Sequence, residues 1–176
     1  MQALYFDMDG TIANLYNVEG WESKLRAEDP SPYADASPLV DMVRLAAIIA
    51  KLRSAGVTVG VISWGAMGGT TEYTREVKRV KMAWCKRYGL AFDEFHVVKY
   101  GTPKHRVAKF KHSVLVDDNS EVRQTWTLGR CATSQSTFGM TARLRGLKPN
   151  RKRALSSPVQ LETGTCEAWR PNKKRG

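Results

Sequence analysis

The sequence predicts an α/β protein built on a doubly wound parallel sheet. Short apolar runs recur along the first 126 residues, and stretches with helical spacing separate them. Strands that alternate with helices are typical of parallel sheets. A third observation is that carboxylates follow the first and the last of these apolar runs directly. The alternation therefore predicts the fold class, and the carboxylates predict where its chemistry lies.

Four segments are predicted as strands: 3–6, 57–62, 96–99 and 113–116. The first and last are apolar at nearly every position, and the second is mostly β-branched. Such continuous apolar strands are expected when both faces of a sheet are covered. The run at 96–99 is the weakest of the four. After residue 126 a fifth strand would complete the sheet, but 127–134 is a poor strand sequence.

Four segments have the pattern of helices. In 38–54, apolar residues recur at helical spacing, with Ser37 as a plausible N-cap and Gly56 as a stop. The segment 72–88 is amphipathic. One of its faces carries Val77, Val80, Lys81, Trp84 and Tyr88. Shorter helices are predicted at 104–110 and 120–126.

The segment 12–37 interrupts the alternation. It contains Trp21, Pro30, Pro32 and Tyr33, which predict a short helix followed by a loop. It leaves the sheet at the carboxyl end of a strand, where open α/β sheets bind ligands. It is therefore either a small cap over the site or a long connection without a catalytic role.

Charge divides the chain into two parts. The net charge is +11, yet residues 1–126 hold 17 Lys+Arg against 15 Asp+Glu, whereas 127–176 hold 11 against 2. We therefore predict one domain at 1–133 and a basic tail at 134–176. The composition of the tail favours disorder. Non-specific nucleic-acid contact through phosphates, a solvated tail without a role, and an altered reading frame remain alternatives.

Little in the sequence indicates a membrane-spanning or secreted protein, or one held together by disulfides or zinc. No apolar run approaches the roughly 20 residues of a membrane span, and the N-terminus lacks the basic flank of a signal peptide. Cys85, Cys131 and Cys166 are odd in number and widely spaced, so neither a disulfide framework nor a zinc site follows. We expect a cytoplasmic protein in which Cys85 fills the core.

Polar residues stand at the end of each predicted strand. Asp7 and Asp9 follow the first, Ser63 the second, Lys104 the third and Asp117–Asp118 the fourth. In a parallel sheet these ends share one edge. Converging carboxylates repel one another unless a cation is bound, and oxygen ligands favour Mg²⁺. A hydroxyl and an ammonium group beside such a metal suit a phosphoryl group.

The segment Asp7-Met8-Asp9-Gly10-Thr11, followed in order by Ser63, Lys104 and Asp117–Asp118, resembles the four motifs of the haloacid dehalogenase (HAD) superfamily of phosphohydrolases. The resemblance spans about residues 1–126 and implies a Rossmann-like sheet with a minimal cap. Small uncharacterised HAD-like proteins of phages and bacteria look similar, which would imply the host cytoplasm if the chain is phage-encoded.

The resemblance also implies roles. Asp7 would be the nucleophile that forms an aspartyl-phosphate, and Asp9 the general acid and base. Ser63 and Lys104 would hold phosphate oxygens. Mg²⁺ would be bound by Asp7, the backbone carbonyl of Asp9, and Asp117, with Asp118 binding directly or through water.

Further residues are expected to bind the substrate. They are Gly10, Thr11, Trp64 and Gly65. Trp21, Tyr33 and Trp64 could stack on a base, although for any one of these rings a place in the core of the cap is the favoured interpretation. Taken alone, each motif could be a capping or loop residue. Their joint order at strand ends favours function.

The sequence therefore predicts a Mg²⁺-dependent phosphatase acting on a phosphate monoester, with nucleotides or nucleic-acid ends as candidate substrates. The alternative is a nucleic-acid-binding protein on the same scaffold that acts through its basic tail. A receiver domain also clusters aspartates with Ser/Thr and Lys. Its paired acids come early and its lone aspartate mid-chain, so the order found here argues against it.

Overall fold

The computed structural model describes residues 1–128 and 132–135. Most of the described chain lies in short regular elements. In chain order these are β1 (Ala3–Phe6), β2 (Ala13–Asn14), the 3-10 turn η1 (Leu15–Asn17), α1 (Trp21–Arg26), α2 (Ser31–Asp35), β3 (Ser37–Pro38), α3 (Met42–Ser54), β4 (Thr58–Trp64), α4 (Thr71–Arg87), β5 (Glu94–Val98), the 3-10 turn η2 (Lys104–Arg106), β6 (Ser113–Asp117), α5 (Ser120–Leu128) and β7 (Ala132–Gln135).

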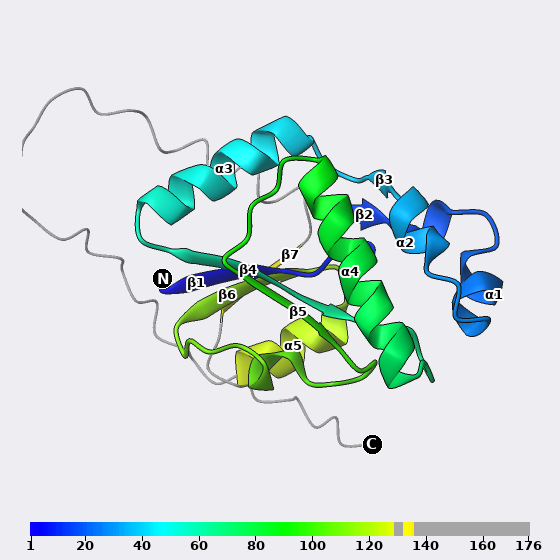
Figure 1. Cartoon of the computed structure of the whole chain (residues 1–176). Coiled ribbons are helices and arrows are strands. Elements are labelled where there is room, and N and C mark those ends of the chain that lie inside the picture. The colour runs from blue at the N-terminus through cyan, green and yellow to red at the C-terminus, as the bar shows by residue number, and fades with distance from the viewer. Residues whose placement is uncertain (129–131, 136–176) are drawn as a thin grey trace, which may run out of the picture. The chain divides into compact units, whose positions relative to one another are not determined.

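Five strands form one parallel sheet in the order β5-β4-β1-β6-β7. The chain starts at the central strand β1, builds outward through β4 and β5, and then returns to add β6 and β7 on the other side (Figure 1). This reversal of strand order defines a doubly wound α/β fold. The predicted fold class is therefore confirmed.

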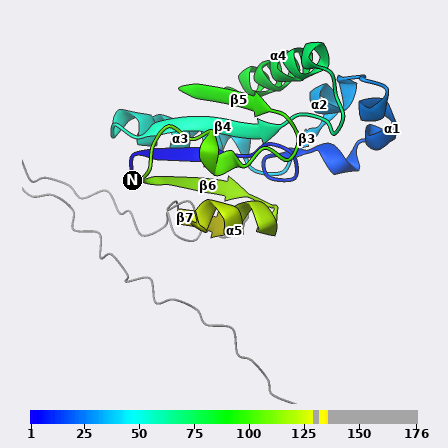
Figure 2. The same ribbon diagram turned by 90° about the horizontal axis from the view of Figure 1, so that it is seen from below.

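Helices cover both faces of the sheet. Helices α3 and α4 lie on one face and α5 on the other (Figures 1 and 2). Along β1, Leu4 and Phe6 pack in the cluster beneath α3 and α4, whereas Ala3 and Tyr5 pack in the cluster beneath α5. Since neighbouring strand residues point to opposite faces, this two-sided covering explains why the strand is apolar at every position.

The insertion between β1 and α3 folds as two short helices, α1 and α2, and not as one helix with a loop. The antiparallel pair β2–β3 closes its base through Ala13↔Pro38 and Asn14↔Ser37. The far end of the insertion is fixed to α4. There the Glu28 carboxylate accepts hydrogen bonds from the backbone N (2.7 Å) and the Oγ1 (2.9 Å) of Thr70, the N-cap of α4.

Two predicted helices have different bounds. Helix α3 begins at Met42, not at Pro38. Asp41 caps it by accepting a hydrogen bond from Arg44 N at 3.0 Å, while Ser37 and Pro38 belong to β3. The helix predicted at 104–110 is reduced to the turn η2. A helix this short gains little from its own hydrogen bonds, and the residues after it pack individually against the cluster beneath α5.

The fifth strand does form. β7 pairs with β6 from Val114↔Ala132 to Asp117↔Gln135, although the sequence predicted a poor strand there. Pairing with an existing strand edge depends on backbone hydrogen bonds, which any residue except proline can make. The strand passes the predicted boundary at 133 by two residues. The remainder of the predicted tail, 136–176, lies outside the described residues, as do Cys131 and Cys166.

The expectation that Cys85 fills the core is confirmed. Cys85 is buried as predicted, with its Sγ 3.9 Å from Met8 Sδ. Burial raises the pKa of its thiol to about 12.

Among residues 1–128 and 132–135, no helix combines the length and the apolar character that crossing a bilayer requires.

Candidate active site

The site lies where the strand order reverses. β1 is flanked by β4 and β6, with Phe6 in register with both Val61 and Val116. The carboxyl ends of these three strands therefore lie together, and ligands of open α/β sheets bind at such a point. Asp7, Ser63 and Asp117 stand at these ends, as predicted from the sequence.

A tight turn follows Asp7. The carbonyl oxygen of Met8 accepts hydrogen bonds from the backbone N of Thr11, Ile12 and Ala13, at 2.9–3.1 Å. Gly10 in this turn has φ +73°, and a Cβ placed on it would lie 2.5 Å from Asp118 Oδ2. Gly10 therefore allows the turn to approach Asp118 closely.

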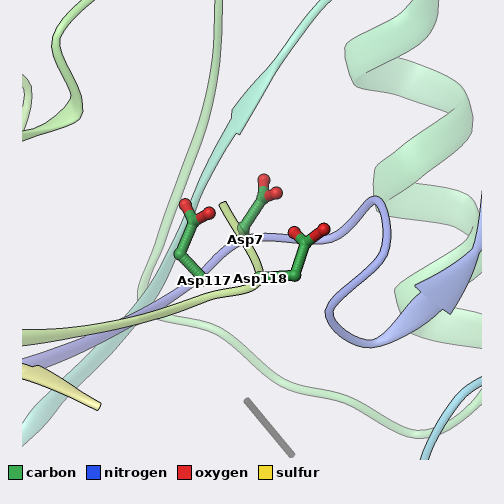
Figure 3. Close-up of side chains that lie close together, drawn as sticks. All are labelled: Asp7, Asp117 and Asp118. Carbon is green, nitrogen blue, oxygen red and sulfur yellow. The ribbon is translucent and has the colours of Figure 1, made fainter. Parts of the chain in front are cut away.

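Three carboxylates form a cluster. One oxygen each from Asp7, Asp117 and Asp118 lies within 4.8 Å of the others (Figure 3). Asp7 and Asp117 are buried, and Asp118 is exposed. Burial, followed by the charge of Asp7, raises the pKa of Asp117 to about 6 and also raises that of Asp118. Asp117 and Asp118 therefore hold their protons to a higher pH than free aspartates do.

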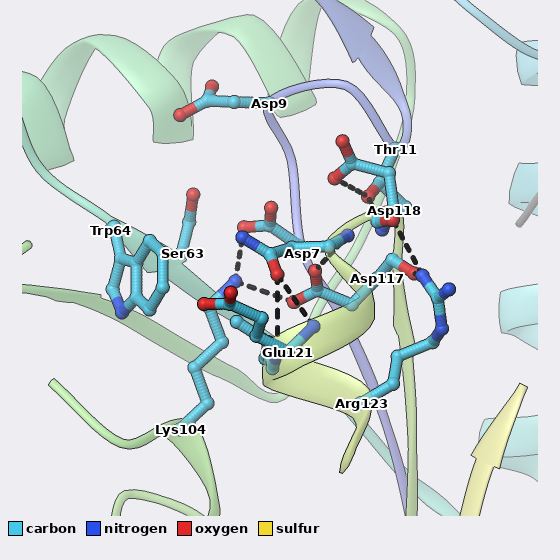
Figure 4. A network of polar contacts seen from close by, with 12 residues as sticks. Asp7, Asp9, Thr11, Ser63, Trp64, Lys104, Asp117, Asp118, Glu121 and Arg123 are labelled. Carbon is cyan, nitrogen blue, oxygen red and sulfur yellow. Dashed lines mark hydrogen bonds and ion pairs between the residues drawn. The ribbon is translucent and has the colours of Figure 1, made fainter. Parts of the chain in front are cut away.

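Lys104 joins two of these acids. Its Nζ lies 2.7 Å from Asp117 Oδ2 and 2.9 Å from Asp7 Oδ1, and the side chain is buried (Figure 4). Burial by itself would lower the pKa of this lysine. The charges of Asp7 and Asp117 outweigh that effect and raise it. Lys104 is therefore a charged ammonium between the two acids.

Thr11 orients Asp118. Its hydroxyl donates to Asp118 Oδ1 at 3.2 Å and accepts from Asp118 N at 3.1 Å. Arg123 supports the same loop, because its Nη1 donates to the backbone oxygens of Asp117 (2.8 Å) and Asp118 (2.6 Å). The structure thus places Thr11, expected at the substrate, against an acid of the cluster.

Lys81 belongs to the site, although the sequence pattern predicted only its position on a helix face and no role in the site. Its Nζ donates to Asp9 Oδ2 (2.6 Å), Ser63 Oγ (2.9 Å) and the Trp64 carbonyl (2.9 Å). It also lies 4.4 Å from the centre of the Tyr33 ring. The signal was present, because Lys81 sits on the apolar face of the predicted helix, and a lysine is rarely buried unless it is paired.

Asp9 is separated from the acid cluster by this contact. Its side chain points away from Asp7, Asp117 and Asp118 (Figure 4). Burial and the charge of Asp7 both raise the pKa of Asp9, whereas the charge of Lys81 lowers it. The net effect is a raised pKa. Two acids two residues apart therefore occupy different environments. The predicted metal contact of Asp9, through its backbone carbonyl, stays a prediction.

A cavity of about 380 Å³ opens beside the acids. Asp7 and Asp9 line it, together with Trp64 and Gly65, two of the residues predicted to bind substrate. Gly10 and Thr11 do not line this cavity, and Ser63 is fully buried behind it. The insertion supplies much of the remaining wall, so it borders the candidate site.

The donor set fits a hard divalent cation. Among residues 1–128, two lysines pair with these four carboxylates, so the set carries two negative charges when all four acids are ionised. The buried Oδ1 of Asp7 forms an ion pair with Lys104, but it accepts no hydrogen bond from any residue that the structure describes. Carboxylate oxygens with spare acceptor capacity are the ligands that Mg²⁺ prefers.

Comparison with known proteins adds two resemblances in fold. Neither a protein-family model nor a curated protein matches the chain. An uncharacterized protein from Corynebacterium glutamicum superposes with a TM-score of 0.45 at 13% identity, over 82% of this chain and 91% of its own. The D,D-heptose 1,7-bisphosphate phosphatase from Burkholderia thailandensis superposes with a TM-score of 0.49 at 14% identity, over 85% and 88%. At these values neither resemblance bears on activity.

The Lys81–Asp9 contact yields a first prediction. Replacing Lys81 with Met removes the one cation paired with Asp9 among residues 1–128, so the pKa of Asp9 should rise further. NMR titration of the metal-free protein measures this pKa directly. The control is Lys78→Met, which changes an exposed lysine of the same helix and should leave the titration of Asp9 unchanged. An unaltered Asp9 titration in Lys81→Met would contradict the assignment.

Proposed function

We propose that this chain is a Mg²⁺-dependent phosphatase of the HAD type, which hydrolyses a phosphate monoester through an aspartyl-phosphate on Asp7. The observation that carries the proposal is the position of Asp7. Its carboxylate lies at the sheet's switch point, beside Asp117 and Asp118, is paired with Lys104, and lines the cavity. The order of the sequence motifs supports the same conclusion.

In the first half of the reaction, an Asp7 oxygen bonds to phosphorus while the bond to the leaving oxygen breaks. The leaving oxygen takes the electron pair and receives a proton from Asp9. A general acid must hold its proton near neutral pH, and the raised pKa of Asp9 favours this. In the second half, Asp9 takes a proton from water as the water oxygen bonds to phosphorus. The bond from phosphorus to the Asp7 oxygen breaks, which releases phosphate and restores the Asp7 carboxylate.

Fixed donors on the chain stabilise the transferred group. Lys104 holds phosphate oxygens beside Asp7, and the Ser63 hydroxyl, which accepts from Lys81, keeps its own proton to donate. Bound by Asp7, Asp117 and Asp118, with the backbone carbonyl of Asp9 as a further ligand, Mg²⁺ would offset the negative charge of the phosphoryl group.

The proposed substrate is a phosphorylated molecule, with nucleotides and nucleic-acid ends as the candidates. We propose that the reaction takes place in the cytoplasm. Asp7 and Asp9 line the cavity and set the position of the phosphate, so the leaving group extends along the remaining wall. This division of the site into a phosphate end and a leaving-group end follows from the lining residues.

The central test is turnover. With Mg²⁺, the chain should hydrolyse members of a panel of phosphorylated compounds that includes the acyl phosphate acetyl phosphate, mononucleotides and 3′- or 5′-phosphorylated DNA. Asp7→Asn should lower kcat by a factor on the order of 10³ or more, because the nucleophile is lost. The matched control is Asp41→Asn, which changes the exposed N-cap of α3 and should retain activity. Absence of turnover across the panel would refute the proposal.

Metal binding should depend on pH. The pKa of Asp117 is raised to about 6, so this acid holds its proton to a higher pH than a free aspartate. Protons then compete with Mg²⁺ below about pH 6, and affinity should fall by up to about tenfold per pH unit there, with little change above about pH 7. Isothermal titration calorimetry between pH 5 and 8 measures this. A constant affinity over the range would argue against Asp117 as a ligand.

The second proposal concerns the basic tail, in which residues 136–176 carry 10 Lys+Arg against 2 Asp+Glu. We propose that it makes non-specific nucleic-acid contacts through phosphates. Truncation after residue 135, which keeps β7, should then weaken binding to single-stranded DNA by about tenfold or more at low salt and flatten its salt dependence. Fluorescence anisotropy across a salt series measures both. Unchanged affinity would remove the tail from consideration.

A further inference from the structure

Two pairs of aromatic rings border the cavity beyond Asp7 and Asp9. Tyr16 and Trp21 come from the insertion, with ring centres 5.2 Å apart. Trp64 ends strand β4 and Tyr100 follows strand β5, with ring centres 5.0 Å apart. Tyr16 is 53% exposed and Tyr100 47%. Exposed rings that gather at one cavity indicate a binding surface, and such rings stack on planar groups.

The wall is held in place from both sides. On the loop side, the indole nitrogen of Trp64 donates to the Thr102 carbonyl at 2.8 Å. On the insertion side, Glu28 binds the N-cap of α4, and Trp84 Nε1 of the same helix donates to the Ala36 carbonyl at 2.7 Å. The cavity is therefore formed before any ligand arrives, as is usual for small-molecule sites.

Beyond Asp7, the charged side chains that line the cavity are paired before any ligand binds. Asp9 is paired with Lys81, and Arg26 with Glu22. Among the described lining residues, no cation is left unpaired to meet a second phosphate. A polynucleotide end brings further phosphates with it, whereas a single nucleoside does not. The leaving group that this wall suits is consequently uncharged.

We infer that the cavity binds the leaving group of the substrate, and that this group is a planar, uncharged ring compound of nucleoside size. The substrate class is then a nucleoside monophosphate, and not the phosphorylated end of a polynucleotide. A volume of about 380 Å³ lies within the usual range for small-molecule sites. This inference rests on the proposed phosphatase function for the position of the phosphate.

Binding can be measured apart from turnover. In the Asp7→Asn protein with Mg²⁺, calorimetry should show adenosine 5′-monophosphate binding about tenfold or more tightly than ribose 5-phosphate, the same ester without the base. A 5′-phosphorylated oligonucleotide, measured on the same full-length protein at a salt concentration that suppresses phosphate contacts by the basic tail, should bind more weakly than the mononucleotide. Equal affinity for the first two ligands, or tighter binding of the oligonucleotide, would overturn the inference.

Ring variants locate the effect. Trp21→Leu and Tyr100→Leu, one from each aromatic pair, should each reduce the preference for the mononucleotide over ribose 5-phosphate by about fivefold or more. The control is Tyr88→Leu, which removes a ring packed on Trp84 outside the cavity and should keep the preference. An unchanged preference in both cavity variants would refute the stacking role.

Turnover separates the two proposals. If acetyl phosphate is hydrolysed through Asp7 but the base adds nothing to binding, the leaving-group inference fails and the phosphatase function stands. If the mononucleotide binds with the predicted preference but no ester is hydrolysed, the cavity assignment stands and the phosphatase function fails.

Discussion

Four carboxylates gather at the carboxyl edge of one sheet, and the mutual repulsion of these acids governs the surrounding structure. Parallel pairing of β1 with β4 and β6 leaves no freedom in where Asp7 and Asp117 lie, because register fixes both. Buried like charges are costly unless they are paired. Lys104 forms ion pairs with Asp7 and Asp117, and Lys81 forms an ion pair with Asp9. The remaining negative charge favours a bound cation.

This arrangement divides the two aspartates of the first motif. Asp7 faces the acid cluster and Lys104, whereas Asp9 faces Lys81 and Ser63. Pairs of acids whose environments differ are suited to different roles in one reaction. Gly10, which follows Asp9, lets the turn after the motif approach the acid cluster closely, because a Cβ there would lie 2.5 Å from Asp118 Oδ2.

Helix α4 connects the chemistry to the cavity. Its buried face supplies Lys81 to the acids and Trp84 to the core, and its N-terminus holds the insertion through Glu28 and Thr70. The insertion in turn brings Tyr16 and Trp21 to the cavity. The residues that tune Asp9 and those that would receive the leaving group are therefore fixed to the same helix, which favours a preformed site.

The strands, the parallel class and the acids at strand ends followed from the sequence alone, because periodicity and the end of an apolar run are local properties. The tertiary structure decided the rest. The role of Lys81 needs Asp9, Ser63 and Tyr33 to meet from separate segments, and no spacing along the chain encodes that meeting. The start of α3 at Met42 and the formation of β7 likewise depended on strand pairing, which outweighs local preference. Which aromatic rings share one cavity was also settled only by packing, since contact between an insertion and a distant loop is a property of the folded chain.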